Sequence, residues 1–156
     1  MKATLVACVL LENNQKYLLV QQARSRRQPG KWGPPGGKPE HEWGETLFEA
    51  ARREAFEEIG REVDLTGFVG LVRSGHRADP NLFVCFAGRL QNPAHADALI
   101  LKAGEISDGR WLSLEEIENA TVPLRATPFA AIFRRFQAGQ IYPLEMVQHE
   151  ALDPQE

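Results

Sequence analysis

A long loop rich in proline and glycine constrains this chain most. Residues 24–44 begin with basic side chains and continue as QPGKWGPPGGKPEHEWG, a run with four prolines and five glycines. Proline lacks a backbone donor and glycine disfavours regular elements, so the segment is predicted to be neither a helix nor a central strand. A loop of this length inside a compact domain is usually functional or disordered.

Regular elements flank this loop on both sides. The turn between the first two strands contains Asn13 and Asn14, which tolerate positive φ, and predicts a hairpin. After the loop a helix begins near Glu45 and Thr46, because apolar residues recur at a helical spacing up to Gly60, a typical C-terminal cap. The two strands of the hairpin are expected at 4–11 and 16–22.

The second half of the chain continues the mixture of strands and helices. Ser113 and Glu116 form the pattern of a capping box, which predicts the start of a short helix. Thr127 before Pro128 predicts the N-cap of another helix that stops at Gly139. Further strands are expected at 68–73, 81–90 and 108–114, and an extended tail or edge strand is expected at 141–148.

Length and composition indicate one globular domain of the α+β class. The chain has 156 residues, of which 43% are hydrophobic and 25% charged, so we expect residues 1–156 to form a single domain with 140–156 as a C-terminal tail or edge strand. The apolar tail is compatible with a subunit contact in a homodimer.

Charge and cysteine content restrict the class of partner. The net charge of −3 argues against stable nucleic-acid binding and against an anionic membrane surface. No run approaches the ~18 apolar residues of a membrane span. Cys8 and Cys85 lie in apolar strand-like runs and are expected to be small buried hydrophobes. These features predict a cytoplasmic protein.

Three carboxylates share one face of the predicted helix. Glu54, Glu57 and Glu58 project to the same side because they are three and four residues apart, and they repel one another. A solvated acidic surface is the ordinary explanation of such a face. Arg53 is placed to pair with Glu57 or to reach back to Glu45, which would relieve part of the repulsion.

The loop before the helix favours a metal site over a solvated surface. The adjacent glycines Gly36 and Gly37 allow the backbone to approach a ligand closely. Mg2+ prefers carboxylates, backbone carbonyls and water as ligands. Three glutamates together with a glycine carbonyl provide such a set, and a bound cation would cancel the repulsion between them.

The segment GGKPEHEWGETLFEAARREAFEEIG, residues 36–60, resembles the signature loop-helix-loop of the Nudix hydrolases. That pattern reads Gly-x5-Glu-x7-Arg-Glu-apolar-x-Glu-Glu-x-Gly-apolar, and this chain matches it from Glu45 to Gly60. Two positions, Ala55 and Arg61, depart from it as packing variants. The loop is two residues longer within KPEHEWG, an insertion that adds Glu40, His41 and Glu42.

The resemblance implies a fold and a set of site residues. The fold would be an α/β/α sandwich with a mixed β-sheet. The metal ligands would be Glu54, Glu57 and Glu58 with the Gly36 carbonyl, while Arg53 and Glu45 would form the ion pair that orients loop and helix. Candidate catalytic residues are Glu45, Arg53, Glu54, Glu57, Glu58 and Glu105. Expected substrate contacts are Arg24, Arg26, Arg27, Lys31, Gly37 and Lys38.

Glu105 is the one candidate carboxylate that lies far from the signature segment, and two interpretations of it remain open. A further carboxylate often comes from a later loop in this family, and Glu105 lies shortly before the strand that contains Trp111. It could bind a metal or serve as general base, and plain loop surface explains it equally well. The aromatic residues Trp32, Phe83, Phe86 and Phe129 could stack on a base, but a core position is favoured for each. For His76, between two strands, an exposed turn is favoured over a substrate contact.

The implied reaction is hydrolysis of a nucleoside diphosphate linked to a group X, with Mg2+ as cofactor and Mn2+ as a substitute. The segment KWGPPGGK is similar to the corresponding segment of the nucleoside-triphosphate pyrophosphatases of this family. This similarity predicts a (d)NTP as substrate, with NMP and pyrophosphate as products. An ADP-ribose or nucleotide-sugar pyrophosphatase remains an alternative. A nucleotide-sensing module without catalysis is a second alternative, against which the intact set of glutamates argues.

Overall fold

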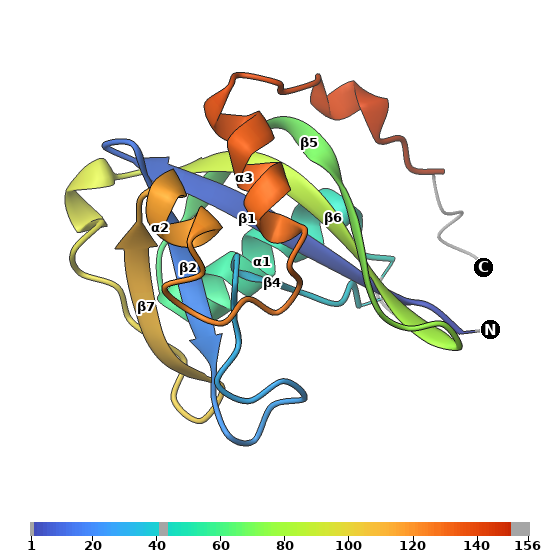
Figure 1. Ribbon diagram of the computed structural model, residues 1–156. Coiled ribbons are helices and arrows are strands. Elements are labelled where there is room, and N and C mark those ends of the chain that lie inside the picture. Colours follow the sequence, from blue (N-terminus) through green and yellow to red (C-terminus); the bar gives the residue numbers. More distant parts are fainter. Residues whose placement is uncertain (1, 41–43, 151–156) are drawn as a thin grey trace.

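The computed structural model describes residues 2–40 and 44–150, and consists of three layers (Figure 1). A seven-stranded mixed sheet lies between helix α1 on one face and helices α2 and α3 on the other, which confirms the expected α/β/α sandwich. The elements are β1 (Thr4–Asn13), β2 (Lys16–Gln22), β3 (Trp32–Gly33), β4 (Gly36–Gly37), α1 (Leu47–Ile59), β5 (Val63–His76), β6 (Asp79–Leu90), β7 (Ile106–Leu112), α2 (Leu114–Glu118) and α3 (Phe129–Gln137), with short 3-10 helices η2 (Pro93–His95) and η3 (Leu144–Met146).

Strand β1 organises both halves of the core. It pairs in parallel with β6 from Thr4 to Leu11, and β6 pairs in antiparallel with β5. Because successive side chains of a strand point to opposite faces, Val6, Cys8 and Leu10 pack toward α2 and α3, whereas Ala7, Val9 and Leu11 pack toward α1. All but the outermost of these side chains are fully buried, so β1 forms the centre of the molecule.

The hairpin of β1 and β2 opens soon after its turn. The two strands pair only at Glu12 with Tyr17 and at Asn13 with Lys16. Farther along, β1 pairs instead with β4, where Cys8 lies opposite Gly36, and β2 pairs with β3 and β7. The segment expected to be loop throughout 24–44 therefore contains two short strands. Their glycines make this possible, because a Cβ at Gly36 would collide with the backbone of β1.

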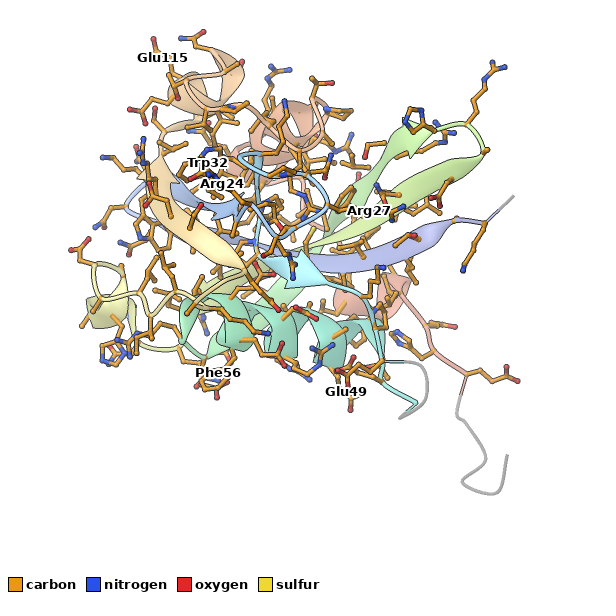
Figure 2. The ribbon with its side chains drawn as sticks, turned by 90° about the horizontal axis from the view of Figure 1, so that it is seen from below. Arg24, Arg27, Trp32, Glu49, Phe56 and Glu115 are labelled. Carbon is orange, nitrogen blue, oxygen red and sulfur yellow. The ribbon has the colours of Figure 1, made fainter. Side chains whose placement is uncertain are left out.

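Helix α1 ends at the predicted Gly60 cap, and its start, expected near Thr46, is fixed by a capping box that the sequence analysis did not predict. The Thr46 hydroxyl accepts from the Glu49 amide, and the Glu49 carboxylate accepts from the Thr46 amide, which completes a capping box. Gly60 adopts the left-handed conformation at φ 65° and donates to the Phe56 carbonyl. Small residues on the inner face, including Ala55, are fully buried and bring α1 close to the sheet. Glu49 and Phe56 lie on the opposite side of the helix and point away from the sheet (Figure 2).

Three expectations about boundaries were wrong. Positive φ falls on Asn14 and Gln15 rather than on Asn13 and Asn14. Pro128, not Thr127, occupies the N-cap position of α3, with helical dihedral angles and no side-chain cap hydrogen bond. Strand β5 extends beyond the expected range 68–73 at both ends, and β6 begins at Asp79, before the expected range 81–90, so that the two strands form a hairpin. Ser113 does form its capping box with Glu116.

The C-terminal tail crosses the edge of β5 (Figure 1). Phe68 and Tyr142 exchange two backbone hydrogen bonds of 2.8 Å, and Gly67 provides the space in which Ile141 packs. Within the described residues no helix is both long and apolar enough to cross a membrane. Of the inserted residues in the signature loop, His41 and Glu42 lie outside the part of the chain that the structure describes.

Removal of the α1 cap tests whether local helix signals stabilise this domain. We expect Thr46→Ala to lower the free energy of unfolding by about 1 kcal/mol, because the Glu49 amide then loses its acceptor. Urea denaturation monitored by circular dichroism measures the change. An equal loss is expected for Ser113→Ala at the matching cap of α2. Unchanged stability in Thr46→Ala would mean that tertiary packing alone sets the start of α1.

Candidate active site

A cleft of about 880 Å³ lies between the signature loop, α1 and the hairpin of β5 and β6. It collects most of the side chains that the sequence singles out. Arg24 and Lys31 do not line the cleft, and both are exposed. Arg27 lies at its rim, where it forms an exposed ion pair of 3.0 Å with Asp79. The predicted residues that line the cleft are Arg26, Arg27, Gly36, Gly37, Lys38, Arg53, Glu54, Glu57 and Glu105.

The three glutamates of α1, which we call the acidic ridge, run from the interior to the surface. The exposed fraction is 1% for Glu58, and the side chains of Glu54 and Glu57 are 16% and 36% exposed. Glu58 therefore lies behind the cleft, Glu54 lies in its wall and Glu57 lies at its mouth. An ordinary solvated acidic surface would not bury one of its members completely and shield a second from most of the solvent.

Glu58 is held at the base of the ridge by the signature loop. Its Oε1 accepts a hydrogen bond of 3.2 Å from the Gly36 amide, whereas its buried Oε2 has no partner among the described residues. Burial raises the pKa of Glu58 to about 8, against the opposing effect of the Gly36 hydrogen bond. A buried oxygen without a donor is costly, and a cation or a proton would satisfy it.

Glu54 lies directly against the second glycine of the pair. A Cβ at Gly37 would overlap the Glu54 carboxyl group, so only glycine allows this close approach. Burial raises the pKa of Glu54, and the neighbouring Arg53 guanidinium partly offsets that effect. The carboxylate therefore lies in the wall of the cleft with its charge only partly screened.

Arg53 connects the acidic ridge to the loop. Its guanidinium donates to both oxygens of Glu45, at 2.7 and 3.0 Å, and also to Glu54 at 2.8 Å and to Glu57 at 3.3 Å. A further bond of 3.1 Å reaches the Lys38 carbonyl in the signature loop. The hydrogen bond to Glu45 is the main reason that the pKa of Arg53 is raised. The positive charge of Arg53 thus offsets much of the repulsion between the carboxylates of the acidic ridge.

Glu105 faces the acidic ridge from the loop before β7. Lys102 lies between them, 3.2 Å from the Glu105 carboxylate and 3.6 Å from that of Glu57. The hydrogen bond that Lys102 donates to Glu105 raises the pKa of Lys102. Arg26 donates to Glu105 at 3.0 Å, which ties the basic loop to the same group. Glu105 is therefore part of the cleft wall rather than plain loop surface.

Among the cleft residues that the sequence interpretation did not single out are Gln28, Lys102 and Arg125. Lys102 had a local signal, because it precedes Glu105 by three residues on the same turn. Arg125 is a charged residue in an otherwise apolar stretch, and its position in the cleft depends on the path of the chain between α2 and α3. The aromatic residues considered for base stacking are instead core, as favoured: Trp32, Phe83, Phe86 and Phe129. His76 is exposed and lines the rim of the cleft.

The chemistry of the ridge fits a divalent cation, although its side chains are held by other partners. Within the described residues no group of three or more His, Cys, Asp and Glu side chains is arranged as a finished metal site. Arg53 and Lys102 occupy oxygens of Glu54 and Glu57. The unpartnered Oε2 of Glu58 and the carboxylates beside it are nevertheless the hard oxygen donors that Mg2+ and Mn2+ prefer.

Fold and cleft together define a three-layer α/β/α protein whose cleft is lined by both carboxylates and basic side chains. Residues 1–135 match the NUDIX domain model. The chain is 34% identical to phosphatase NudJ of Escherichia coli K12 over 143 residues, which cover 91% of this chain and 88% of the relative. The chain belongs to the Nudix hydrolase family and is an enzyme that hydrolyses acid anhydrides in phosphorus-containing substrates.

Solved structures support the same fold. A NUDIX hydrolase from Nitrosomonas europaea superposes with a TM-score of 0.79 at 24% identity, covering 96% of this chain and 98% of the other. A MutT protein from Methanosarcina mazei superposes with a TM-score of 0.72 at 25% identity, covering 89% and 96%. Enzymes of this family generally use divalent cations and act on small nucleotide substrates.

The raised pKa of Glu58 predicts how stability depends on pH in the metal-free protein. Below the ~4.3 at which a glutamate titrates in an unfolded chain, both states carry the proton. Between there and about 8 the folded state retains a proton that the unfolded state has lost, so rising pH destabilises the fold. We expect the melting temperature in EDTA to fall as pH rises through this window.

Calorimetry at several pH values measures this slope. Glu58→Gln should flatten it, because the amide does not titrate, whereas Glu115→Gln on exposed α2 should leave it unchanged (Figure 2). An identical slope in the native protein and in Glu58→Gln would show that Glu58 is ionised alike in the folded and unfolded states.

Proposed function

We propose that this enzyme is a Mg2+-dependent pyrophosphohydrolase that cleaves a phosphoanhydride bond in a nucleoside diphosphate linked to X, with a (d)NTP as substrate. The observation that carries the proposal is the buried, unpartnered Oε2 of Glu58 at the base of a ridge that continues through Glu54 and Glu57 to the cleft. The products would be NMP and pyrophosphate. Mn2+ would substitute for Mg2+.

The acidic ridge would hold the cation. Glu54, Glu57 and Glu58 would supply carboxylate oxygens, and we extend the proposal to Glu105 and to the Gly36 carbonyl. Bound Mg2+ supplies a Lewis acid for the phosphate oxygens and lowers the pKa of a bound water. Arg53 and Glu45 would keep the loop and α1 in register while the ligand carboxylates exchange their present partners, because their ion pair does not use the ridge.

The basic side chains of the cleft would bind the substrate phosphates. Arg26, Lys38 and Lys102 line the same space as Glu54 and Glu57, so positive charge faces the position of a diphosphate held by the ridge. Gly37 and Arg27 border this space. Arg24 and Lys31, which are exposed outside the cleft, would contribute only to the long-range attraction of an anion.

Proton transfer requires a carboxylate beside the attacking water. We propose Glu54 or Glu105 for this role, since both line the cleft from opposite walls. Glu105 is held there by Arg26 and Lys102, whereas Glu54 is wedged against Gly37. Proton acceptance by one of them would leave the other to orient the phosphate or the cation.

Several further predictions accompany the reaction. The acidic overall charge supports a protein that does not bind nucleic acid stably, and the composition supports a cytoplasmic enzyme. We also keep two predictions about organisation. Residues 1–156 would form a single domain with 140–156 as a tail, and the protein would form a homodimer. The relative NudJ is named a phosphatase, so phosphate release is the result that would argue for a different bond being cut.

Product identity tests the proposed reaction. We expect a screen of (d)NTPs, ADP-ribose and nucleotide-sugars with Mg2+ to give NMP and pyrophosphate from a (d)NTP. Glu57→Gln should lower kcat by about a hundredfold or more, since a ligand at the mouth of the ridge is lost. Chromatography of the products and initial rates provide both measurements.

The control for this experiment is Glu115→Gln, which removes the same charge from an exposed position on α2 in the opposite layer (Figure 2). It should retain native activity. Full activity of Glu57→Gln would refute the metal assignment. NMP with a sugar phosphate as the main products would identify the alternative substrate class, a nucleotide-sugar or ADP-ribose.

Metal binding can be measured without catalysis. We expect saturating Mg2+ to raise the melting temperature, because a ligand of the native state alone stabilises it by ~2.7 kcal/mol at about a hundred times its Kd. Gly37→Ala should abolish this shift, since its Cβ must displace Glu54. Gly109→Ala, whose Cβ would lie 3.3 Å from the flexible Leu101 side chain, should retain it. A melting curve that neither cation moves would contradict the site.

A further inference from the structure

Arg125 is a cation in the cleft wall that has no salt-bridge partner among the described residues, although the charge of Glu58 acts on it from a longer distance. Within residues 2–40 and 44–150 it forms no ion pair, although every other arginine that lines the cleft does. The Arg125 side chain is only partly exposed, and burial lowers its pKa. Burial of a guanidinium without a salt bridge is unfavourable, and Glu58 offsets only part of this effect because the pKa of Arg125 stays lowered, so a polar ligand at the free donors would stabilise the group.

The position of Arg125 is fixed by its surroundings. Its Nε donates to Gln28 Oε1 at 2.9 Å, while Gln28 Nε2 donates back to the Arg125 carbonyl at 3.1 Å. The Arg125 amide donates to the Trp32 carbonyl at 2.7 Å. The guanidinium carbon lies 5.3 Å from the centre of the Phe83 ring, so one face of the group is covered.

The two terminal nitrogens of Arg125 are left to bind a ligand. Of the five guanidinium donors, the Nε–H is bonded to Gln28, and neither Nη atom donates to a described residue. These donors lie in the plane of the guanidinium and form a fork. A fork of parallel donors matches two acceptors that lie side by side in one plane.

The contacts of Arg125 favour a neutral, planar ligand over a phosphate. Gln28 and the Phe83 ring lie against the guanidinium, and Val6 and Asn81 also line the cleft. The two lysines that line the cleft instead contact the ridge and its arginine, Lys102 through Glu57 and Lys38 through a backbone bond from Arg53. Neutral amides and an apolar surface with a few directed donors are typical of a pocket for the organic part of a ligand.

We propose that Arg125, positioned by Gln28, is the specificity-determining residue for the base of the nucleotide, and that it selects bases with two adjacent acceptors in one plane. Guanine offers O6 and N7, the usual partners of an arginine fork. Cytosine offers N3 and O2, whereas adenine and uracil present no two adjacent acceptors. This inference rests on the proposed function in that the ridge and Arg125 would hold the two ends of one substrate.

Binding of reaction products tests the inference without turnover. Isothermal titration calorimetry with Mg2+ should give GMP and CMP an affinity about tenfold or more above that of AMP and UMP, the lower end of what a bidentate contact contributes to discrimination. Arg125→Lys keeps the charge and removes the fork, so the ratio should fall to about one. Inorganic pyrophosphate, which lacks a base, should bind both proteins equally.

The controls separate charge, folding and recognition. Arg125→Met should lose the same discrimination, and Arg135→Met, which removes an exposed cation from α3, should keep it. The affinities of the unmodified protein for the four monophosphates test the inference even if a variant does not fold. Equal affinity for all four monophosphates, or a loss of pyrophosphate affinity in Arg125→Lys as large as that for GMP, would overturn the inference. Selective binding without hydrolysis would refute the proposed function and leave the base specificity intact.

Discussion

The hydrogen bond from the Gly36 amide to Glu58 joins the two parts of the molecule on which the site depends. It forms because β1 and β2 separate beyond their turn, which leaves the edge of β1 open to the two residues of β4. The bond draws the last turn of α1 onto the signature loop. The contact of Glu54 with Gly37 and the bond from Arg53 to the Lys38 carbonyl join the same loop and helix nearer the cleft.

Arg53 has a different role at the same junction. It is the only side chain in the described parts of the chain that bonds to Glu45, Glu54 and Glu57 together. In this state the like charges of α1 are balanced by an internal cation instead of a bound one. A divalent ion that enters the ridge competes with Arg53 for Glu54 and Glu57, whereas the bidentate pair with Glu45 is untouched.

Local signals predicted the parts of the fold that local chemistry determines. The Gly60 cap of α1 and the capping box of Ser113 with Glu116 were predicted from residues within one turn of the chain, and both are present. The capping box of Thr46 with Glu49 is equally local, although only the helix start near Thr46 was predicted. The start of α3 was misplaced by one residue because Thr127 and Pro128 satisfy the same sequence pattern.

The position of Arg125 in the cleft was harder to predict from the sequence. Arg125 meets Gln28 across 97 positions of sequence, and their contact depends on how the segment after α2 crosses β3. Nothing in the residues around either one specifies that meeting. The acidic ridge, in contrast, lies on one helix with a known period, so its shared face could be deduced before any tertiary contact was known.

The bridge between Phe68 and Tyr142 has a consequence for assembly. An outer strand normally presents a row of free backbone groups to which another chain can add. Here the chain's own tail uses the groups of Phe68, which occludes the middle of β5. Two copies could not extend one continuous sheet across this point. A symmetric contact on this side would instead have to bury the exposed side chains of Leu71, Tyr142 and Met146.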